Sequence, residues 1–404
     1  MQSSVPFGVY VHVPWCRRRC PYCDFALVPV ERAPSADFAR FVSAEIEAAP
    51  RREPGGVVVG DRLRGRAAVS LYFGGGTPSM LEPRDVGAIA EAVARTFGLA
   101  ARAEMTLEVN PEDVTRERLD GFRAAGVNRL SLGVQALDDR FLRALGREHD
   151  AATAVRSVEI ARVCGFDDVS FDLIFAVQGG EHGAAMTLAE WEATLARAIA
   201  LAPTHISCYG LTVERGTVLD RLVARGAEAL VEEDTQAAMY ELAVQRLGAA
   251  GLPRYEVSNF AAPGHRAVHN SLYWRYAEWL GFGPSAHSFL RVGTPRSREA
   301  GGVRFWNDKN PVAWMKRGGA PSGGQEVITG RAAMGEFAFT SLRLVEGMRD
   351  GDFAAIFGVM PGEIFGAELA RLEKIGLVVR EGEMTRLTDR GYLLSDSVFA
   401  DLVA

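Results

Sequence analysis

Hydrophobic and polar positions along the first half of the chain follow two alternating patterns. Short runs of β-branched and aromatic residues are separated by longer stretches in which apolar residues recur every three or four positions. The first pattern is typical of buried strands and the second of amphipathic helices, so their alternation predicts parallel βα units. The expected strands are residues 8–13, 69–74, 105–110, 129–134, 168–175 and 205–211, and the expected helices include 36–49, 82–97, 115–126 and 151–165. Six units before the pattern changes near residue 215 predict a partial, TIM-like (β/α)6 barrel.

Residues suited to chemistry follow the end of each expected strand. In chain order they are a cysteine-rich loop, Gly74-Gly75-Gly76-Thr77, Glu108, Gln135, Asp172 and Tyr209. In barrels of this kind, the loops at the carboxyl ends of the strands build one site. We therefore expect these groups to line a common cavity.

The pattern beyond residue 215 is less regular. A helix is expected near 230–251, a short strand near 255–261, an aromatic-rich irregular segment over 269–289, and loops at 293–303 and 317–325. The tail, residues 330–404, predicts helices around a hairpin, the order of a small α+β winged-helix-like domain. Residues 331–404 carry 8 Lys and Arg against 12 Asp and Glu, so this tail is net acidic, which disfavours DNA binding. We expect a barrel core at 1–215, an extension at 216–329 and a docking or capping domain at 330–404.

Composition narrows the class of protein. The formal net charge of −6 argues against broad nucleic-acid binding. Five cysteines, three of them on one loop, do not suggest a disulfide framework, and a reducing cytoplasm is the expected location. The chain contains no apolar run of about 18 residues, and its first residues lack the cationic segment of an export signal. The sequence does not decide between a monomer and a homodimer.

The cysteine-rich loop CRRRCPYC holds Cys16, Cys20 and Cys23. His12 is near enough in sequence to complete a Cys3His zinc site, which is one alternative. The other is an iron–sulfur cluster of four irons, which normally takes four thiolates. Three thiolates would leave one iron open to a small molecule that carries an amine and a carboxylate.

Both cysteine spacings, the aromatic Tyr22 and the position after the first strand resemble the radical S-adenosylmethionine enzymes. The resemblance implies a 4Fe–4S cluster held by the three cysteines and S-adenosyl-L-methionine bound at its open iron. It also implies the partial barrel of that superfamily. The bound cofactors supply the difficult chemistry in such proteins, and the chain binds, orients and shields them.

The motifs VYVHVPWC, YFGGGTPS, LEVNP and HISCYGLTVERGT, with the tail, resemble the oxygen-independent coproporphyrinogen oxidase group over nearly the whole chain. The oxidases of that group have a further cysteine two residues after the third, where Phe25 stands here. The haem chaperone branch lacks it and has His-Asn-x-x-Tyr-Trp, which is found here from His269 to Trp274. The sequence is therefore placed with the haem chaperones. One departure is Ala176-Val177-Gln178, where the group usually has Gly-Leu-Pro.

The resemblance implies roles for individual residues. Contacts to the first S-adenosylmethionine are implied for Tyr10, Tyr22, Gly75, Gly76, Thr77 and Glu108, and contacts to a second for Gln135, Arg147 and Asp172. Structural alternatives stay open: a tight turn for the glycines, a solvated carboxylate for Glu108 and an Arg147–Asp172 salt bridge. Cys164 and Cys208 are expected in the core.

A haem site is expected around His269, because imidazole binds haem iron and Tyr273 and Trp274 offer flat apolar area. A packed aromatic cluster that contains a hydrogen-bonded His269 is the structural alternative, and His265 and His287 are substitute ligands. The leading hypothesis is a haem chaperone that delivers haem to cytochromes or respiratory enzymes. The alternatives are a coproporphyrinogen oxidase or radical methyltransferase, and a zinc-stabilised scaffold.

Overall fold

The computed structural model describes residues 5–179, 183–319 and 323–403. All six expected strands are present: β1 (Phe7–Val13), β4 (Ala68–Gly75), β5 (Leu99–Val109), β6 (Arg129–Gln135), β7 (Asp168–Phe175) and β8 (His205–Gly210). They pair in parallel in this order. The partial barrel is therefore confirmed.

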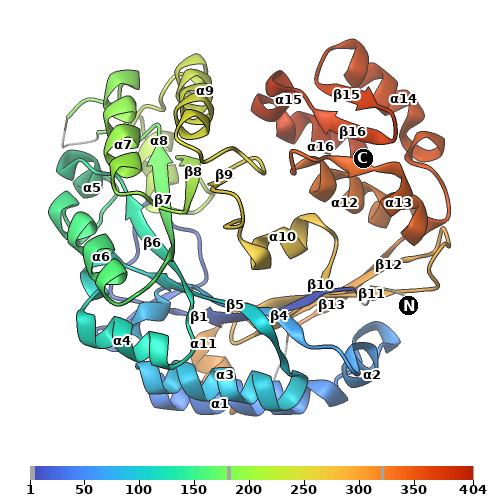
Figure 1. Cartoon of the computed structure of the whole chain (residues 1–404), viewed down its shortest axis with the longest axis horizontal. Helices are drawn as coiled ribbons and strands as arrows, with labels where there is room; N and C mark the ends of the chain where they lie inside the picture. Colours follow the sequence, from blue (N-terminus) through green and yellow to red (C-terminus); the bar gives the residue numbers. More distant parts are fainter. Residues whose placement is uncertain (1–4, 180–182, 320–322, 404) are drawn as a thin grey trace.

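Helices cover the outer face of the curved sheet, and each expected helix is present (Figure 1). The expected helices are α1 (Ser35–Ala48), α3 (Pro83–Phe97), α4 (Arg116–Ala124), α6 (Ala151–Val163) and α9 (Glu233–Ala249), and α7 (Leu188–Ala200) is a further one that the prediction did not name. The alternate apolar residues of the strands, such as Val9, Val11, Leu71 and Phe73, are fully buried against these helices. The other residues of each strand face the inside of the curve, because side chains alternate along a strand.

The sheet is wider than the sequence predicts. Its order is β13-β12-β11-β10-β1-β4-β5-β6-β7-β8-β9, so a set of strands from the extension continues it beyond β1. At the other edge the short strand expected near 255–261 is present as β9 (Asn259–Ala261), antiparallel to β8. β10 (Glu278–Phe282) runs parallel to β1, and β11 (His287–Val292), β12 (Gly301–Trp306) and β13 (Gln325–Thr329) follow in antiparallel fashion. The irregular segment expected over 269–289 is thus wrong in part. It contains α10 (Val268–Trp274) and β10 and the start of β11.

The C-terminal residues form a second hydrophobic core. Its elements are α12 (Gly330–Leu342), β14 (Met348–Arg349), α13 (Asp350–Phe357), α14 (Pro361–Lys374), β15 (Val378–Glu381), β16 (Met384–Leu387), α15 (Asp389–Leu393) and α16 (Ser395–Val403). The predicted hairpin is present as β15 and β16, and β14 adds a third strand to make a small antiparallel sheet in the order β14-β16-β15. Tyr276 and Phe289 of the extension belong to this same core. Figure 1 shows α10 between the inside of the barrel and this C-terminal unit.

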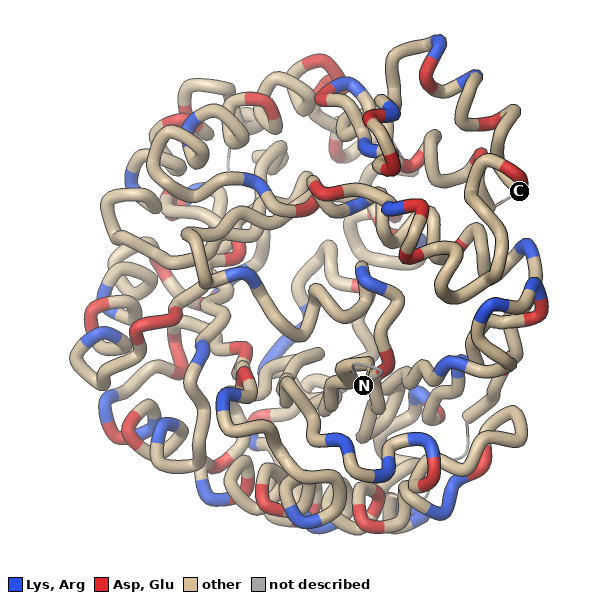
Figure 2. Tube along the Cα trace, turned by 45° about the vertical axis from the view of Figure 1, so that its right-hand side comes forward, with Lys and Arg blue, Asp and Glu red and all other residues tan. Residues whose placement is uncertain are grey.

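Acidic and basic residues are interspersed along the chain trace in Figure 2. Among the described residues, no helix combines the length and apolar character that crossing a bilayer requires.

Candidate functional site

The cysteine loop follows β1 at the rim of the barrel. Cys16 lies in the two-residue strand β2 (Trp15–Cys16), which pairs with β3 (Val28–Pro29) and brings the loop back on itself. Arg19 donates hydrogen bonds to the carbonyl oxygens of Phe25 (2.9 Å) and Leu27 (2.7 Å). The loop is thus held in place by one of its own arginines, and the three cysteines are left partly exposed.

These cysteines line a cavity of about 420 Å³, here called the barrel cavity. The cavity meets the expectation of a common site, because residues at the ends of β4, β5, β6, β7 and β8 share it. The predicted site residues that line it are Cys16, Cys20, Tyr22, Cys23, Gly75, Gly76, Thr77, Glu108, Gln135, Arg147 and Asp172. Two predicted contacts, Tyr10 and His269, are not among its lining residues.

The donor set of the loop fits a cluster better than a single zinc ion. Within the described residues, no three His, Cys, Asp or Glu side chains are arranged to hold one metal ion. His12 already uses both ring nitrogens, Nδ1 with the Tyr10 hydroxyl (3.0 Å) and Nε2 with the Ala26 carbonyl oxygen (2.9 Å). A cluster of four irons takes each thiolate at a separate corner, so its donors need not converge. The geometry therefore disfavours the Cys3His alternative.

Burial raises the pKa of Cys16 to about 11, and a hydrogen bond of 3.0 Å with Thr77 Oγ1 acts in the opposite direction. The thiolate form of such a group needs a nearby cation, which iron supplies in a cluster. Arg147 lies beside Cys20, with 3.8 Å between its guanidinium nitrogen and the sulfur. Burial by itself would lower the pKa of Arg147, but Tyr22 and Cys20 raise it, so it stays charged.

The glycine run packs against the chain itself. A Cβ atom on Gly76 would lie 2.5 Å from the Trp15 carbonyl oxygen, and one on Gly75 would lie 2.6 Å from the His12 ring. The Gly76 amide donates to the Val13 carbonyl oxygen (2.7 Å), and the Gly75 amide donates to Glu108 Oε2 (3.1 Å). Glycine is therefore required here so that β4 can approach β1 and the cysteine loop. Both amides have protein partners in this structure.

Glu108 is held at the end of β5 by two donors. Besides the Gly75 amide, the Tyr72 hydroxyl donates to its Oε1 (2.8 Å). Burial raises the pKa of Glu108 to about 7, and these hydrogen bonds oppose that rise. The solvated carboxylate of the structural alternative is not what the structure shows.

The residues expected at a second cofactor also line the barrel cavity. Asp172 accepts a hydrogen bond from Ser131 (3.2 Å), and burial raises its pKa. Arg147 donates to Asn110 Oδ1 (2.6 Å) and forms no ion pair with Asp172 among the described residues, so that alternative is wrong. Gln135 has a φ of 63°, a left-handed conformation that turns the chain where β6 ends.

Several cavity residues were missed from the sequence. They are the inward-facing polar residues of the barrel strands, namely Thr106, Arg129, Ser131, Ser170, His205 and Ser207, whereas Tyr209 lines the cavity as expected. A signal for them exists, because polar residues occupy alternate positions in β5, β6, β7 and β8. Such alternation indicates that the inside of this barrel is polar, unlike the apolar interior of a closed TIM barrel.

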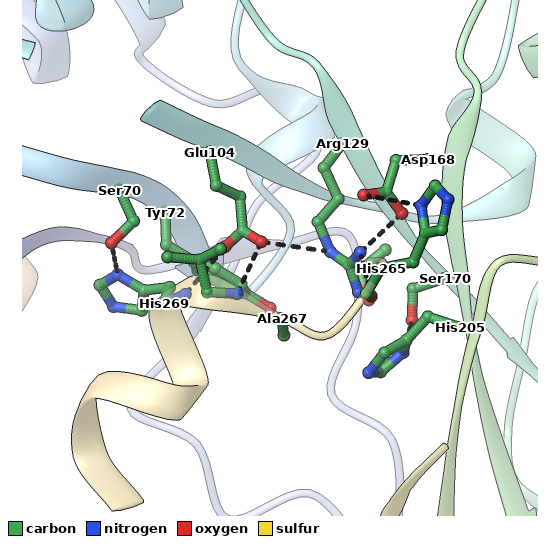
Figure 3. Close-up of polar contacts among 12 residues, drawn as sticks. Ser70, Tyr72, Glu104, Arg129, Asp168, Ser170, His205, His265, Ala267 and His269 are labelled. Carbon is green, nitrogen blue, oxygen red and sulfur yellow. Dashed lines mark hydrogen bonds and ion pairs between the residues drawn. The ribbon is translucent and has the colours of Figure 1, made fainter. Parts of the chain in front are cut away.

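A buried polar network that includes the cavity residue Arg129 anchors α10 (Figure 3). Glu104 accepts hydrogen bonds from the backbone amides of Val268 (2.8 Å) and His269 (2.9 Å). Arg129 lies 3.9 Å from Glu104 and 2.6 Å from Asp168, so its charge balances both carboxylates. The first turn of α10 is therefore attached to β5, β6 and β7 at once.

His269 is buried, and both of its ring nitrogens have partners. Nδ1 is 2.8 Å from the Ser70 hydroxyl, which Figure 3 shows, and Nε2 is 2.8 Å from the Tyr273 hydroxyl. The ring also stacks on Tyr72, with 5.2 Å between ring centroids. Burial lowers the pKa of His269 to about 3, so the ring is neutral. Binding to iron through this residue would require one of the two hydrogen bonds to break.

The other residues singled out from the sequence lie in the core or outside the barrel cavity. Cys164 and Cys208 are core residues, as expected. Tyr10 stacks beside Tyr72 and lines a second cavity instead of the barrel cavity. Ala176 has a φ of 59°, which explains why glycine suits this position and shows that the departure from the usual motif preserves a left-handed turn.

Comparisons with known proteins identify the family of the chain. The family model of the radical SAM superfamily matches residues 10–188, and that of the HemN C-terminal domain matches residues 328–394. The chain is 34% identical to heme chaperone HemW of Mycobacterium tuberculosis, over 98% of this chain and 95% of that protein. It is 30% identical to heme chaperone HemW of Bacillus subtilis, over 97% of this chain and 98% of that protein.

A mitochondrial relative and a solved structure extend the comparison. The chain is 32% identical to the mitochondrial radical S-adenosyl methionine domain-containing protein 1 of Bos taurus, over 98% of this chain and 87% of that protein. Coproporphyrinogen III oxidase (HemN) from Escherichia coli superposes with a TM-score of 0.78 at 22% identity, over 99% of this chain and 91% of that chain. At that identity the likeness shows the fold alone, which is the partial barrel with its C-terminal domain.

Proposed function

The chain belongs to the HemW family of the radical SAM superfamily, and from this premise we propose that it is a haem chaperone. It binds haem together with a 4Fe–4S cluster and S-adenosyl-L-methionine, and it transfers haem to acceptor proteins such as cytochromes or respiratory enzymes. The acceptors and a cytoplasmic location belong to the proposal. The observation that carries it is the loop of three cysteines, all of which line the barrel cavity.

The proposal gives each part of the barrel cavity a role. Cys16, Cys20 and Cys23 hold the cluster, which when bound supplies a reducing electron to the sulfonium of S-adenosylmethionine. Thr77 hydrogen-bonds the first thiol, and Arg147 places a positive charge beside the second. Both interactions stabilise an anionic sulfur.

Binding of the S-adenosylmethionine is assigned to residues next to the cluster loop. Tyr22, Gly75, Gly76 and Thr77 form the wall, and Glu108 is the acceptor for the cofactor's amine or ribose. Because its pKa is about 7, Glu108 is a carboxylate in a large part of the population at neutral pH. Tyr10 acts on this wall through its hydrogen bond to His12.

A second S-adenosylmethionine near Gln135, Arg147 and Asp172 is a further part of the proposal. These residues all line the same cavity, and Arg147, which lies beside Cys20, forms no direct ion pair with Asp172 among the described residues. Equilibrium dialysis with the reconstituted protein tests this part. Two molecules bound per chain are expected, and Asp172→Asn should leave one.

Anaerobic reconstitution tests the chaperone proposal. We expect about four irons and four sulfides per chain, one shift of the cluster spectrum on addition of S-adenosylmethionine, and a Soret band on addition of haem. Transfer is then measured by mixing the haem-loaded protein with an apocytochrome. A colourless chain without acid-labile sulfide, or one that retains all its haem, contradicts the proposal.

The product formed from coproporphyrinogen III distinguishes the oxidase alternative from the chaperone proposal. Phe25 stands where the oxidases of the group have a cysteine, and its side chain is 56% exposed at the rim of the cavity. Incubation of the reconstituted protein with coproporphyrinogen III, S-adenosylmethionine and a reductant should yield no protoporphyrinogen. Its formation at catalytic turnover would replace the chaperone proposal with the oxidase.

A further inference from the structure

A second cavity, of about 440 Å³, lies beside the barrel cavity and is here called the aromatic cavity. Its walls come from β1, from α10, from the strands β10, β11 and β12 of the extension, and from α12 of the C-terminal unit. Tyr273, Trp274, Trp279, Phe289 and Phe339 all line it. Flat apolar walls of this kind suit a planar aromatic ligand, and the volume lies in the range of ligand sites.

The rings of these walls are held in fixed orientations by one another. Trp279 stacks on Phe289 with 5.0 Å between centroids and an interplanar angle of 25°. Tyr273 meets the edge of Trp279, with 4.6 Å between centroids. Because each ring restricts its neighbour, the cavity is formed in advance of binding, which lowers the entropic cost of ligand ordering.

One histidine on this wall has a ring that is available to a ligand. His287 begins β11, is exposed and stacks on Trp306 with 5.5 Å between centroids. Within residues 5–179, 183–319 and 323–403, no hydrogen bond to its ring nitrogens is found. Burial of part of the ring, then the charge of Arg304, lowers its pKa. A neutral imidazole with a free nitrogen is the form that binds iron.

Two polar atoms of cavity residues are unpaired. The indole nitrogen of Trp274 and the hydroxyl of Tyr276 are buried, and neither has a hydrogen-bond partner among the described residues. Buried polar groups in proteins are paired in the great majority of cases. A hydrogen-bond acceptor on a ligand, or a water, would satisfy these two donors.

The charges at this cavity neutralise one another. Arg304 donates to Glu326 and to Glu336, each at 2.7 Å. The guanidinium is therefore not free to recruit an anion, and the cavity selects its ligand by shape and by the metal that His287 can reach. The propionates of a porphyrin would then lie at the open rim, in contact with water.

We propose that haem docks in the aromatic cavity and that His287, not His269, is its axial protein ligand. This inference rests on the proposed function and specifies its haem site. It separates the two histidines by role: His269 is a structural residue that joins α10 to β4, and His287 presents a nitrogen to the iron. The wall between this cavity and the cysteine loop is formed by Tyr10 and His12, so haem and cluster occupy neighbouring sites.

Titration of the anaerobically reconstituted full chain with ferric haem and with metal-free protoporphyrin IX tests the inference. In His287→Ala, haem should bind about tenfold more weakly or worse and lose the electron paramagnetic resonance signature of a nitrogen axial ligand. Binding of the metal-free porphyrin should not change, because it needs the aromatic walls alone. His265→Ala is the matched control, since His265 is also partly exposed but lies outside the cavity.

Three results separate the inference from the proposed function. If the unsubstituted chain binds no haem, the chaperone proposal fails together with the inference. If it binds haem and His287→Ala keeps both affinity and spectrum, the inference alone is overturned. The same holds if His269→Gln, which retains a side chain capable of both hydrogen bonds, removes the axial signature.

A blocking variant tests the cavity independently of the ligand. Thr340 lines the cavity from α12, and Thr340→Trp adds a large ring there while His287 stays intact. Haem and metal-free protoporphyrin should both bind more weakly by about tenfold or more, with iron and sulfide content unchanged. Unchanged affinity for both porphyrins would place the haem elsewhere.

Discussion

Replacing His269 by alanine tests whether this residue is structural. The imidazole joins Ser70 of β4 to Tyr273 of α10 and stacks between aromatic rings. Its removal leaves two hydroxyls without partners, at a cost of about 1 kcal/mol each. The void left by a fully enclosed ring costs a further ~2 kcal/mol. We expect the free energy of unfolding to fall by about 4 kcal/mol.

Equilibrium urea unfolding of the apoprotein measures this loss. Tryptophan fluorescence and far-ultraviolet circular dichroism should report the same transition, which establishes that one free energy describes it. His269→Gln should lose about 2 kcal/mol, because an amide keeps donor and acceptor groups but not the stacked ring. A loss below about 1 kcal/mol in His269→Ala would refute the reasoning.

The pH dependence of the same variants gives a second measure. The pKa of His269 is about 3 in the folded chain and near 6.5 when unfolded, so its contribution to stability is complete above pH 6.5 and is lost as the pH falls toward 3. At pH 5 that loss amounts to about 2 kcal/mol. The difference in stability between the unsubstituted chain and His269→Gln should therefore shrink by this amount from pH 7 to pH 5. An unchanged difference contradicts a buried, neutral His269.

Three further predictions concern the cluster loop and α10. Gly76→Ala places a Cβ atom 2.5 Å from the Trp15 carbonyl oxygen, so the iron and sulfide content per chain should fall after reconstitution. The control Gly366→Ala, whose Cβ position has no atom near it, should retain the full iron and sulfide content. Cys23→Ala should abolish the cluster absorption while the thermal unfolding midpoint of the apoprotein stays unchanged; a full cluster spectrum would exclude Cys23 as a ligand. Glu104→Gln removes a charge that faces two amides of α10 and the guanidinium of Arg129. We expect the free energy of unfolding in urea to fall by about 2 kcal/mol. A change near zero would contradict the anchoring of α10 by Glu104.

Local patterns carried the prediction of the barrel. Each of the six parallel strands is a short segment whose period of apolar residues is set by its own geometry, so β1 and β4 to β8 could be located from sequence. The strands of the extension were missed because their pairing is remote. β10 pairs with β1, and the paired residues Phe7 of β1 and Glu278 of β10 are far apart in the chain. Aromatic residues on both faces of β10 also hide the alternation of apolar and polar positions.

The sequence by itself brings the three proposed cluster ligands together, since three cysteines within one short loop stay together in any fold that keeps the loop at a strand end. It could not determine which histidine is free to bind iron. That depends on Ser70, which reaches His269 from a strand 199 positions away, and on Trp306, which holds His287 at the wall of the aromatic cavity. Whether a nitrogen is free is a property of its neighbours in space, and only the tertiary structure brings those neighbours together.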